Sequence, residues 1–404
     1  MSKKIPLGVS ITALLVAVAL TAVITVFSYK NIYNNILEDL PQRKEQYSRL
    51  NEIEELVRTE YYGSVDYGTL NDSLASGYVE GLNDNRSFYI SADNYKAYND
   101  YLNGKIAGCG LTVSFDSEKS CLEIKSIDEN SSASSAGLKT GMMIYSVDGT
   151  NVSAENYSKL VSKLDGDAGE TVKLGLVTFL ENDEISRNTV SVRNGYSAVT
   201  CTSSVSGEIG YIRISSFNDN TNEKFREELA SLIEEGIKGL IIDVRNNNGT
   251  DIYSAVKITD RIVPLASDGT GAVATAKNSR GDVIEIFPAD SESLNIPIAV
   301  LINDRTAGAA ELLACDLRDF GKARLVGEKT AGVGTMQKLF KLNDGSAIVL
   351  SIARIYPYIS DPYDNEGITP DDAVKLDEGL KNTLESLDRN LDTQYLAAYA
   401  YLAG

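Results

Sequence analysis

The sequence predicts a mixed α/β protein, because three stretches of the chain carry three different patterns. Apolar residues recur at helical spacing between residues 31 and 103, short strand-like runs follow up to about residue 193, and strands alternate with helices from residue 205 to about residue 358. Such alternation is typical of a layered α/β core. We therefore divide the chain into residues 1–30, a cytoplasmic stub with a membrane anchor; 31–104, a helical arm; 105–193, a small β-rich domain; 194–360, the α/β core; and 361–404, a helical C-terminal segment that packs on the core or on a dimer arm.

The amino terminus carries an apolar run over residues 5–27, which is long enough to span the hydrocarbon core of a membrane. A cleaved signal peptide is the alternative, and Ala17-Val18-Ala19 resembles a cleavage site, but the apolar run continues to Phe27. We expect an uncleaved, single-pass anchor. Lys3 and Lys4 place the start of the chain inside, so the bulk of it is expected outside the cytoplasmic membrane, although Lys30 weakens this charge bias.

The arm is predicted to contain two polar helices. Leu50, Ile53, Leu56 and Val57 fall at helical spacing, and a second helix is expected over residues 70–82. The many charged residues favour a solvated stalk or a dimerisation arm.

Composition excludes several classes of function. The 404 residues include no histidine and carry a net charge of −19. Without an imidazole there is no Ser-His-Asp triad, Cys-His pair or HExxH zinc site, so acid–base chemistry must come from Lys, Asp, Glu, Tyr or Cys. The acidic balance argues against nucleic-acid binding. The four scattered cysteines form no CxxC motif, so no metal or other cofactor is predicted; we expect buried free thiols, with a Cys109–Cys121 bridge left open.

Residues 105–193 are predicted to form a small domain of short strands. Residues 110–115 and 121–124 indicate a hairpin, and a helix is expected over residues 156–164. The run from Ser134 to Gly149, with Ala-Gly-Leu, Gly, Ile, Val and Gly at fixed spacing, resembles the signature of a PDZ domain of the bacterial protease-associated kind. Thr140 and Met142 replace the usual Pro and Asp of that signature.

This resemblance implies a peptide-binding site. A PDZ domain takes up an extended peptide as an added strand and captures its terminal carboxylate with backbone amides. The matching turn here is Gly108-Cys109-Gly110-Leu111, and its glycines would allow the close approach of a ligand. The alternative is that these glycines only make a turn.

The segment from residue 205 to 358 is predicted to hold the strands 209–214, 239–244, 298–303 and 324–327, with helices between them. Ligand or catalytic groups of such sheets lie at the carboxyl ends of the strands, which here means near Arg245 and Asp304.

The chain after the anchor resembles the C-terminal processing peptidases, also called tail-specific proteases. The resemblance is in order and nearly end to end, and it rests on five motifs: Gly210-Tyr211-Ile212-Arg213, Asp243-Val244-Arg245-Asn246-Asn247, Val326-Gly327-Glu328-Lys329-Thr330, Glu366-Gly367-Ile368-Thr369-Pro370-Asp371 and Leu391-Asp392-Thr393-Gln394. It implies a serine peptidase with a Ser-Lys dyad, which needs no histidine, and it makes a homodimer through the arms plausible.

The dyad of that family is absent from this chain. The family's motif Ser-Ala-Ser-Ala-Ser-Glu, whose middle serine is the nucleophile, matches residues 306–311 and places Gly308 at that serine. The family's Gly-Lys-Gly matches residues 332–334 and places Val333 at the lysine. Gln337 still matches the residue that orients the lysine. Glycine offers no nucleophile and valine carries no proton, so the resemblance predicts a pseudopeptidase.

Two further parts of the sequence bear on catalysis: the loop that matches the family's oxyanion loop, and the residues that could replace the missing dyad. The family's Asn-Pro-Gly-Gly loop reads Asn247-Asn248-Gly249-Thr250 here, so a changed turn is expected at Gly249 and Thr250. Thr306 and Lys329 are the nearest candidates for a relocated dyad, although Lys329 also fits an ordinary surface charge.

Three hypotheses follow. The first is a membrane-anchored pseudopeptidase that binds extended or C-terminal segments of extracytoplasmic proteins and acts on partners of active relatives. The second is an active serine-type or threonine-type endopeptidase that uses Thr306 and Lys329. The third is a structural or assembly protein that acts through its helical arms.

Overall fold

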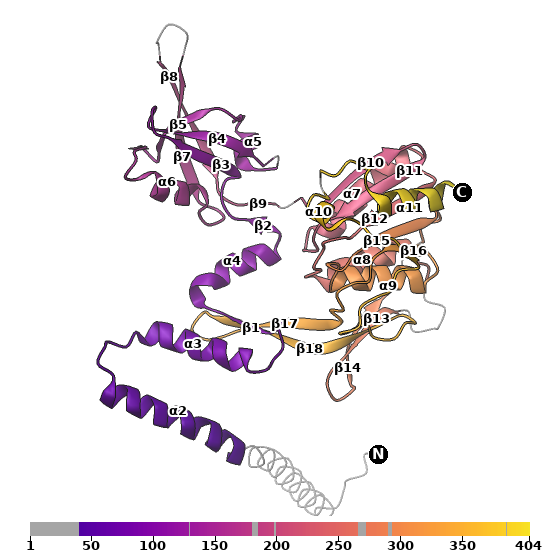
Figure 1. The fold of residues 1–404 in the computed structure, drawn as a ribbon, viewed down its shortest axis with the longest axis horizontal. Coiled ribbons are helices and arrows are strands. Elements are labelled where there is room, and N and C mark those ends of the chain that lie inside the picture. The colour runs from indigo at the N-terminus through magenta and orange to yellow at the C-terminus, as the bar shows by residue number, and fades with distance from the viewer. Residues whose placement is uncertain are drawn as a thin grey trace, which may run out of the picture. The chain divides into compact units, whose positions relative to one another are not determined.

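The computed structural model describes residues 40–128, 130–179, 185–197, 199–265, 272–289, 293–384 and 386–404 (Figure 1). The chain divides into two compact units, Met1–Asn71 and Asp72–Gly404. The apolar run over residues 5–27 lies outside the described residues. Within the described part, no helix is both long enough and apolar enough to cross a membrane.

The expected arm contains helices, but it is not helical throughout. α2 (Leu40–Glu60) and α3 (Tyr67–Glu80) cover the two predicted helices. After them, β1 (Phe88–Ile90) pairs antiparallel with β18 (Ala347–Pro357), and α4 (Ala92–Leu102) follows. Ile90 is buried in a small cluster with Ala347 and Val349, so apolar packing draws this short segment into a sheet of the core.

Residues 105–193 form a β-rich module. β2 (Lys105–Ile106) pairs with β9 (Tyr196–Ser197) at its base. Its main sheet has the order β3-β4-β5-β7-β8, with β6 (Thr150–Asn151) paired to β5. The strands are β3 (Leu111–Asp116), β4 (Cys121–Ile127), β5 (Met143–Val147), β7 (Thr171–Phe179) and β8 (Ile185–Arg193), and the helices are α5 (Ser132–Ser135) and α6 (Tyr157–Leu164). The predicted β3–β4 hairpin is confirmed.

The core is a three-layered α/β structure around a sheet of order β10-β11-β12-β15-β16-β19. β10 (Cys201–Ser206) runs antiparallel to β11 (Ile209–Ile214) at one edge. The other strands run parallel to β11: β12 (Gly239–Asp243), β15 (Ile298–Ile302), β16 (Ala323–Gly327) and β19 (Asp372–Ala373).

Side chains alternate between the two faces of this sheet, as the period of two requires. Leu240 and Ile242 of β12 pack in the larger cluster beneath α7 (Thr221–Glu234), α8 (Ile252–Ile262) and α9 (Ala309–Asp319). Ile241 packs on the other face with Tyr395 and Ala398 of α11 (Thr393–Ala403). The C-terminal segment, which also contains α10 (Glu378–Lys381), therefore supplies the third layer.

A second sheet was not anticipated from the sequence. It has the order β1-β18-β13-β14, and β17 also pairs with β18. Its remaining strands are β13 (Ala272–Lys277), β14 (Val283–Pro288) and β17 (Thr335–Lys341). The four cysteines are free and buried, so the Cys109–Cys121 bridge is not formed.

Candidate functional site

The turn that connects β15 to α9 contains Gly308, the residue that the motif spacing predicts at the position of the nucleophile. β15 ends at Ile302, and Gly308 is the N-cap of α9, with φ +57 and ψ −121. This left-handed conformation is strained for any residue with a Cβ atom, and glycine adopts it without that cost. The turn thus keeps a sharp strand-to-helix connection, while its central residue has no side chain.

The space beside Gly308 is filled by the loop that replaces the family's oxyanion loop. A Cβ atom at residue 308 would lie 2.4 Å from the carbonyl oxygen of Gly249 and 3.2 Å from that of Asn248. The loop is held there by two backbone hydrogen bonds: Ala307 N donates to Asn247 O (2.9 Å) and Ala309 N donates to Gly249 O (3.0 Å). The Gly249 carbonyl therefore occupies the place into which a nucleophile would project.

The carboxylate of Glu311 connects the turn at Gly308 with the segment around Val333. Its Oε2 atom accepts hydrogen bonds from Gly308 N (3.0 Å) and from Val333 N (2.7 Å), so residues 308 and 333 are brought to the same oxygen. Its Oε1 atom accepts from Gly332 N (2.8 Å) and from the Thr330 hydroxyl. Burial raises the pKa of Glu311, whereas these four donors favour its charged form. Glu311 is therefore a buried carboxylate whose two oxygens are both hydrogen-bonded.

Gln337 is present but points into a different network. Its Nε2 atom donates to the hydroxyl oxygens of Thr335 (2.7 Å) and Ser351 (3.2 Å). Arg86 also reaches Thr335 Oγ1 (3.0 Å), and it donates to Gly332 O (2.9 Å) and to Asp364 (2.5 Å). An arginine from the arm thus anchors the backbone next to Val333. The sequence held no signal for this role, because Arg86 lies far from residue 333 in the chain.

The structure does not bring Thr306 and Lys329 together as a hydrogen-bonded pair. Thr306 is fully buried, and its hydroxyl donates to Val244 O (3.0 Å) and accepts from Asn303 N (3.0 Å), as in a structural turn. Lys329 is exposed. A lysine that serves as a general base lies in a site shielded from water, and Lys329 does not lie in such a site.

The carboxyl end of β12 holds a buried ion network. The Arg245 side chain is 1% exposed and donates to Asp243 Oδ2 (2.6 Å), Asp392 Oδ2 (2.7 Å) and Gln394 Oε1 (2.9 Å). Burial alone would raise the pKa of Asp243, but the guanidinium groups of Arg245 and Arg213 outweigh it and lower the pKa to about 2. This network joins the core sheet to the first turn of α11.

Asp304, expected near a ligand, instead pairs with Lys381 (3.1 Å). Lys381 Nζ also lies 2.9 Å from Glu328 and 2.8 Å from Glu378, so three carboxylates surround one lysine. No group of His, Cys, Asp and Glu side chains in the described ranges is arranged to hold a metal ion.

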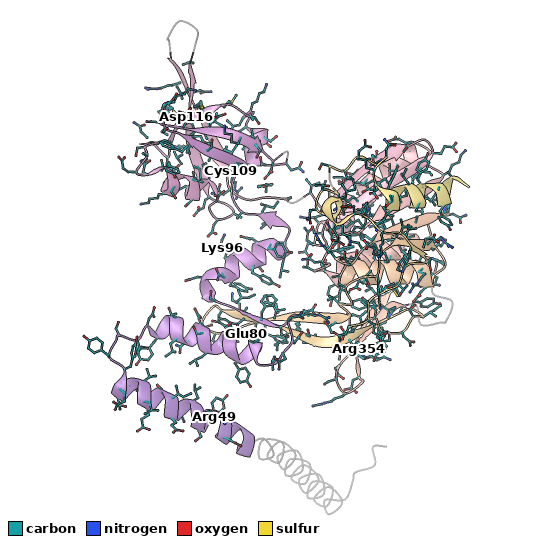
Figure 2. All side chains as sticks on the ribbon, in the orientation of Figure 1. Arg49, Glu80, Lys96, Cys109, Asp116 and Arg354 are labelled. Atoms are coloured by element: carbon teal, nitrogen blue, oxygen red, sulfur yellow. The ribbon has the colours of Figure 1, made fainter. Side chains whose placement is uncertain are left out.

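The expected peptide-binding turn lies at the start of an open strand. β3 is an edge strand of its sheet, and α6 lies beside it, with Phe115 stacked on Tyr157 at 4.7 Å. Figure 2 labels Cys109, in the turn before this strand, and Asp116, the last residue of the strand. Within the turn, Gly108 N already donates to Gly166 O (2.9 Å) and Cys109 N to Leu164 O (2.8 Å), so fewer amides face a ligand than the four residues suggest. Burial also raises the pKa of the Cys109 thiol to about 11.

The fold is a layered α/β core with a sharp strand-to-helix turn between β15 and α9. The model of peptidase family S41 matches residues 208–374. A carboxyl-terminal-processing protease from Synechocystis sp. is 30% identical over 306 residues, covering 74% of this chain and 69% of that protein. The carboxy-terminal processing protease CtpA from Bacillus subtilis is 28% identical over 340 residues, covering 83% and 70%. The chain therefore belongs to peptidase family S41, among the carboxyl-terminal-processing proteases.

A solved structure supports the fold alone. The putative S41 protease from Bacteroides fragilis NCTC 9343 aligns with a TM-score of 0.51 at 19% identity, over 85% of this chain and 92% of that one.

Proposed function

We propose that this chain is a pseudopeptidase, a member of its family that binds peptide segments without cleaving them. The motif resemblance assigns Gly308 and Val333 to the positions of nucleophile and base. One observation supports the proposal: the backbone amides of both residues donate to the buried carboxylate of Glu311. No side chain at either position can attack a carbonyl or accept a proton. The Gly249 carbonyl further occupies the space of the nucleophile.

The second part of the proposal is a PDZ-like peptide site in the module of residues 105–193. Its support is the free edge of β3, whose backbone can pair with an added strand, and the neighbouring α6. The apolar side chains of Val113, Phe115 and Val161 pack together around the core of this module. The ligand class is an extended segment with a free C-terminal carboxylate.

The setting of this activity is also a proposal. The apolar run over residues 5–27 would anchor the chain in the cell membrane, with its bulk outside the cytoplasm. The ligands would then be extracytoplasmic proteins, including those handled by active relatives, and a homodimer through the arms is part of the same hypothesis.

The test is a titration of the full-length chain with an apolar peptide carrying a C-terminal carboxylate and with the same peptide as its amide. We expect saturable binding of the acid, and weaker binding of the amide by about tenfold, which is about 1.4 kcal/mol. Val161→Glu places a negative charge on α6, beside the edge of β3, and should weaken binding of the acid. Ser162→Glu, on the exposed face of the same helix, is the matched control. Equal binding of acid and amide, or no saturable response, would favour the structural role instead.

A further inference from the structure

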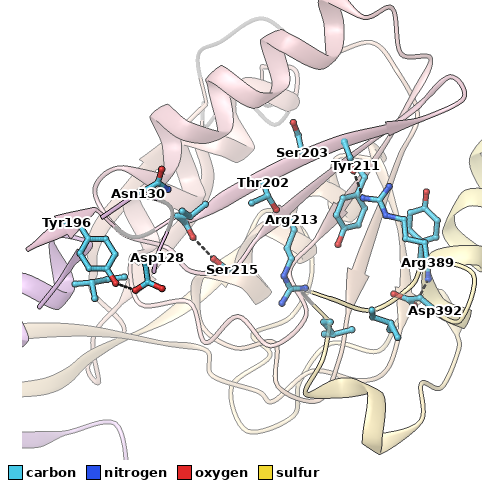
Figure 3. Close-up of a pocket in the computed structure, with 16 residues that line it drawn as sticks. Asp128, Asn130, Tyr196, Thr202, Ser203, Tyr211, Arg213, Ser215, Arg389 and Asp392 are labelled. Carbon is cyan, nitrogen blue, oxygen red and sulfur yellow. Dashed lines mark hydrogen bonds between the residues drawn. The ribbon is translucent and has the colours of Figure 1, made fainter. Parts of the chain in front are cut away.

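The cavity drawn in Figure 3, of about 620 Å³, is lined by residues of β10, of β11 and of the C-terminal segment. Its charged groups balance one another: the carboxylates of Asp128, Asp243 and Asp392 are matched by the guanidinium groups of Arg213, Arg245 and Arg389. This cavity therefore does not indicate which class of ligand it could hold. The β-rich module is more informative, because contacts define both ends of its peptide site.

We define the β3–α6 site as the free edge of β3 together with the side of α6 that lies beside it, and backbone hydrogen bonds close one end of it. Cys109 N donates to Leu164 O (2.8 Å), and Gly108 N donates to Gly166 O (2.9 Å). These bonds join the turn before β3 to the last residue of α6 and to the loop after it. The C-terminal end of α6 is thus fixed beside the start of β3.

Two aromatic rings close the other end of the β3–α6 site. Phe115, near the end of β3, is stacked on Tyr157, the first residue of α6, with the ring centres 4.7 Å apart and an angle of 12° between the rings. Phe115 is half-buried, whereas Tyr157 is 39% exposed. Because one ring comes from the strand and the other from the helix, the stack joins the two sides of the site.

Between its two ends the site has an apolar lining. Leu111 and Val113 of β3 lie on the same face of the sheet as Phe115, because side chains alternate along a strand. All three contact the core cluster of the module, to which Leu160 of α6 also belongs. Val161 of α6 is half-buried against the same cluster.

The separation of the two ends sets the number of ligand residues that fit. The strand from Leu111 to Phe115 is roughly 14 Å long, and the helix from Tyr157 to Leu164 is roughly 10 Å long. An extended ligand rises by about 3.4 Å per residue, so about three residues fit between the turn and the stack. Side chains of directly opposite residues in a sheet share one face, so a ligand residue opposite Phe115 would meet the stacked rings.

We infer that Phe115 and Tyr157 determine the length specificity of the β3–α6 site, which reads only about the last three residues of an apolar C-terminal tail. This inference rests on the proposed function, because it concerns the same peptide site. A longer segment binds along β3 only after the two rings separate, and their separation gives up the favourable contact of the stack. Residues that precede the tail therefore add nothing to the affinity.

The test compares acetyl-Ala-Leu-Val with an acetylated octapeptide that ends in the same three residues, both with a free carboxylate, titrated calorimetrically into the full-length chain. We expect the two affinities for the wild-type chain to agree within about twofold. Tyr157→Ala removes one ring of the stack, so the octapeptide should then bind about fivefold more tightly than the tripeptide. Tyr157→Phe keeps the ring and is the matched control, which should behave as the wild-type chain.

Phe115→Leu is the second variant. It keeps an apolar side chain against the core cluster but removes the other ring, so it should favour the octapeptide as Tyr157→Ala does. Octapeptide binding by the wild-type chain that is about fivefold tighter than tripeptide binding, or an unchanged ratio of the two affinities in both variants, would overturn the inference and leave the peptide site in place. If neither peptide bound saturably to any of these chains, the proposed function would fail, and the inference with it.

Discussion

Two polar clusters lie at the carboxyl ends of the neighbouring strands β12 and β15, and they differ in how their charges are compensated. Beyond β12, Arg245 holds Asp243 and Asp392 in a buried network of charged hydrogen bonds. Beyond β15, the turn at Gly308 has no reactive side chain, and Glu311 collects the donors around it. The first cluster joins the core sheet to α11 through charged groups, and the second joins two turns through one carboxylate and neutral donors.

The comparison predicts its largest effect on stability in the Arg245 cluster. Arg245→Met should destabilise the chain by about 3–5 kcal/mol, because it leaves the buried Asp392 without its cation and Asp243 with Arg213 alone. Arg324→Met, which breaks an exposed pair with Asp372, should cost less than about 1 kcal/mol. The midpoints of urea unfolding measure both. Equal effects of the two variants would mean that the buried network does not support the fold as described.

The second-largest loss of stability is expected when Glu311 is replaced. Glu311→Gln replaces an acceptor oxygen by an amide group that faces backbone N–H donors, so we expect a loss of about 2–3 kcal/mol. The exposed Glu366→Gln is the control and should change little. Urea unfolding followed by circular dichroism gives both values. If Glu311→Gln left the free energy of unfolding unchanged, this would contradict the view that the carboxylate holds residues 308 and 333 in place.

A smaller loss is expected when the nucleophile is restored. Gly308→Ser introduces a Cβ atom at φ +57 and 2.4 Å from the Gly249 carbonyl, so it should destabilise the chain by about 2 kcal/mol. The double variant Gly308→Ser/Val333→Lys should therefore remain inactive. Adding Asn248→Pro and Thr250→Gly, which rebuild the family's loop, should relieve the overlap and raise the unfolding midpoint relative to the double variant. If Gly308→Ser alone were as stable as the wild-type chain, the loop at Gly249 would be able to move away from residue 308 at little cost in free energy.

Asp316, a buried residue of α9, should make the stability of the chain depend on pH. Burial raises the pKa of this carboxyl well above its usual range, and its Oδ2 atom has no partner. Because the folded chain then holds a proton that the unfolded chain releases, stability should fall as the pH rises above about 4, by up to about 1.4 kcal/mol per pH unit until the folded pKa is passed. Asp316→Asn should remove this slope while leaving stability near pH 3 unchanged. Thermal unfolding between pH 3 and 8 measures it, and identical slopes would refute it.

Much of the core could be predicted from the sequence, because its parallel strands are continuous apolar runs. The runs at residues 239–244 and 298–303 matched β12 and β15 closely. The second sheet was missed because β14 is largely exposed and β17 lacks a clear apolar alternation, so no periodic signal distinguishes them from loops. β1 was missed because three residues inside a helical stretch carry no pattern of their own.

For the site, the sequence could locate the changed positions but not their surroundings. The positions of Gly308 and Val333 follow from motif spacing alone. Two features of the site depend on contacts between segments that are distant in the chain. One oxygen of Glu311 accepts from the backbone amides of Gly308 and Val333, and Arg86 donates to Gly332 O. Such long-range contacts leave no local signal.

The most direct test of the central claim is a cleavage assay of the full-length chain on β-casein as an unstructured protein. We predict no fragments from the wild-type chain, because Gly308 and Val333 supply neither nucleophile nor base. Thr306→Ala and Lys329→Ala are assayed in parallel. Turnover by the wild-type chain that disappears in either variant would contradict the account and would establish an active peptidase with a relocated dyad.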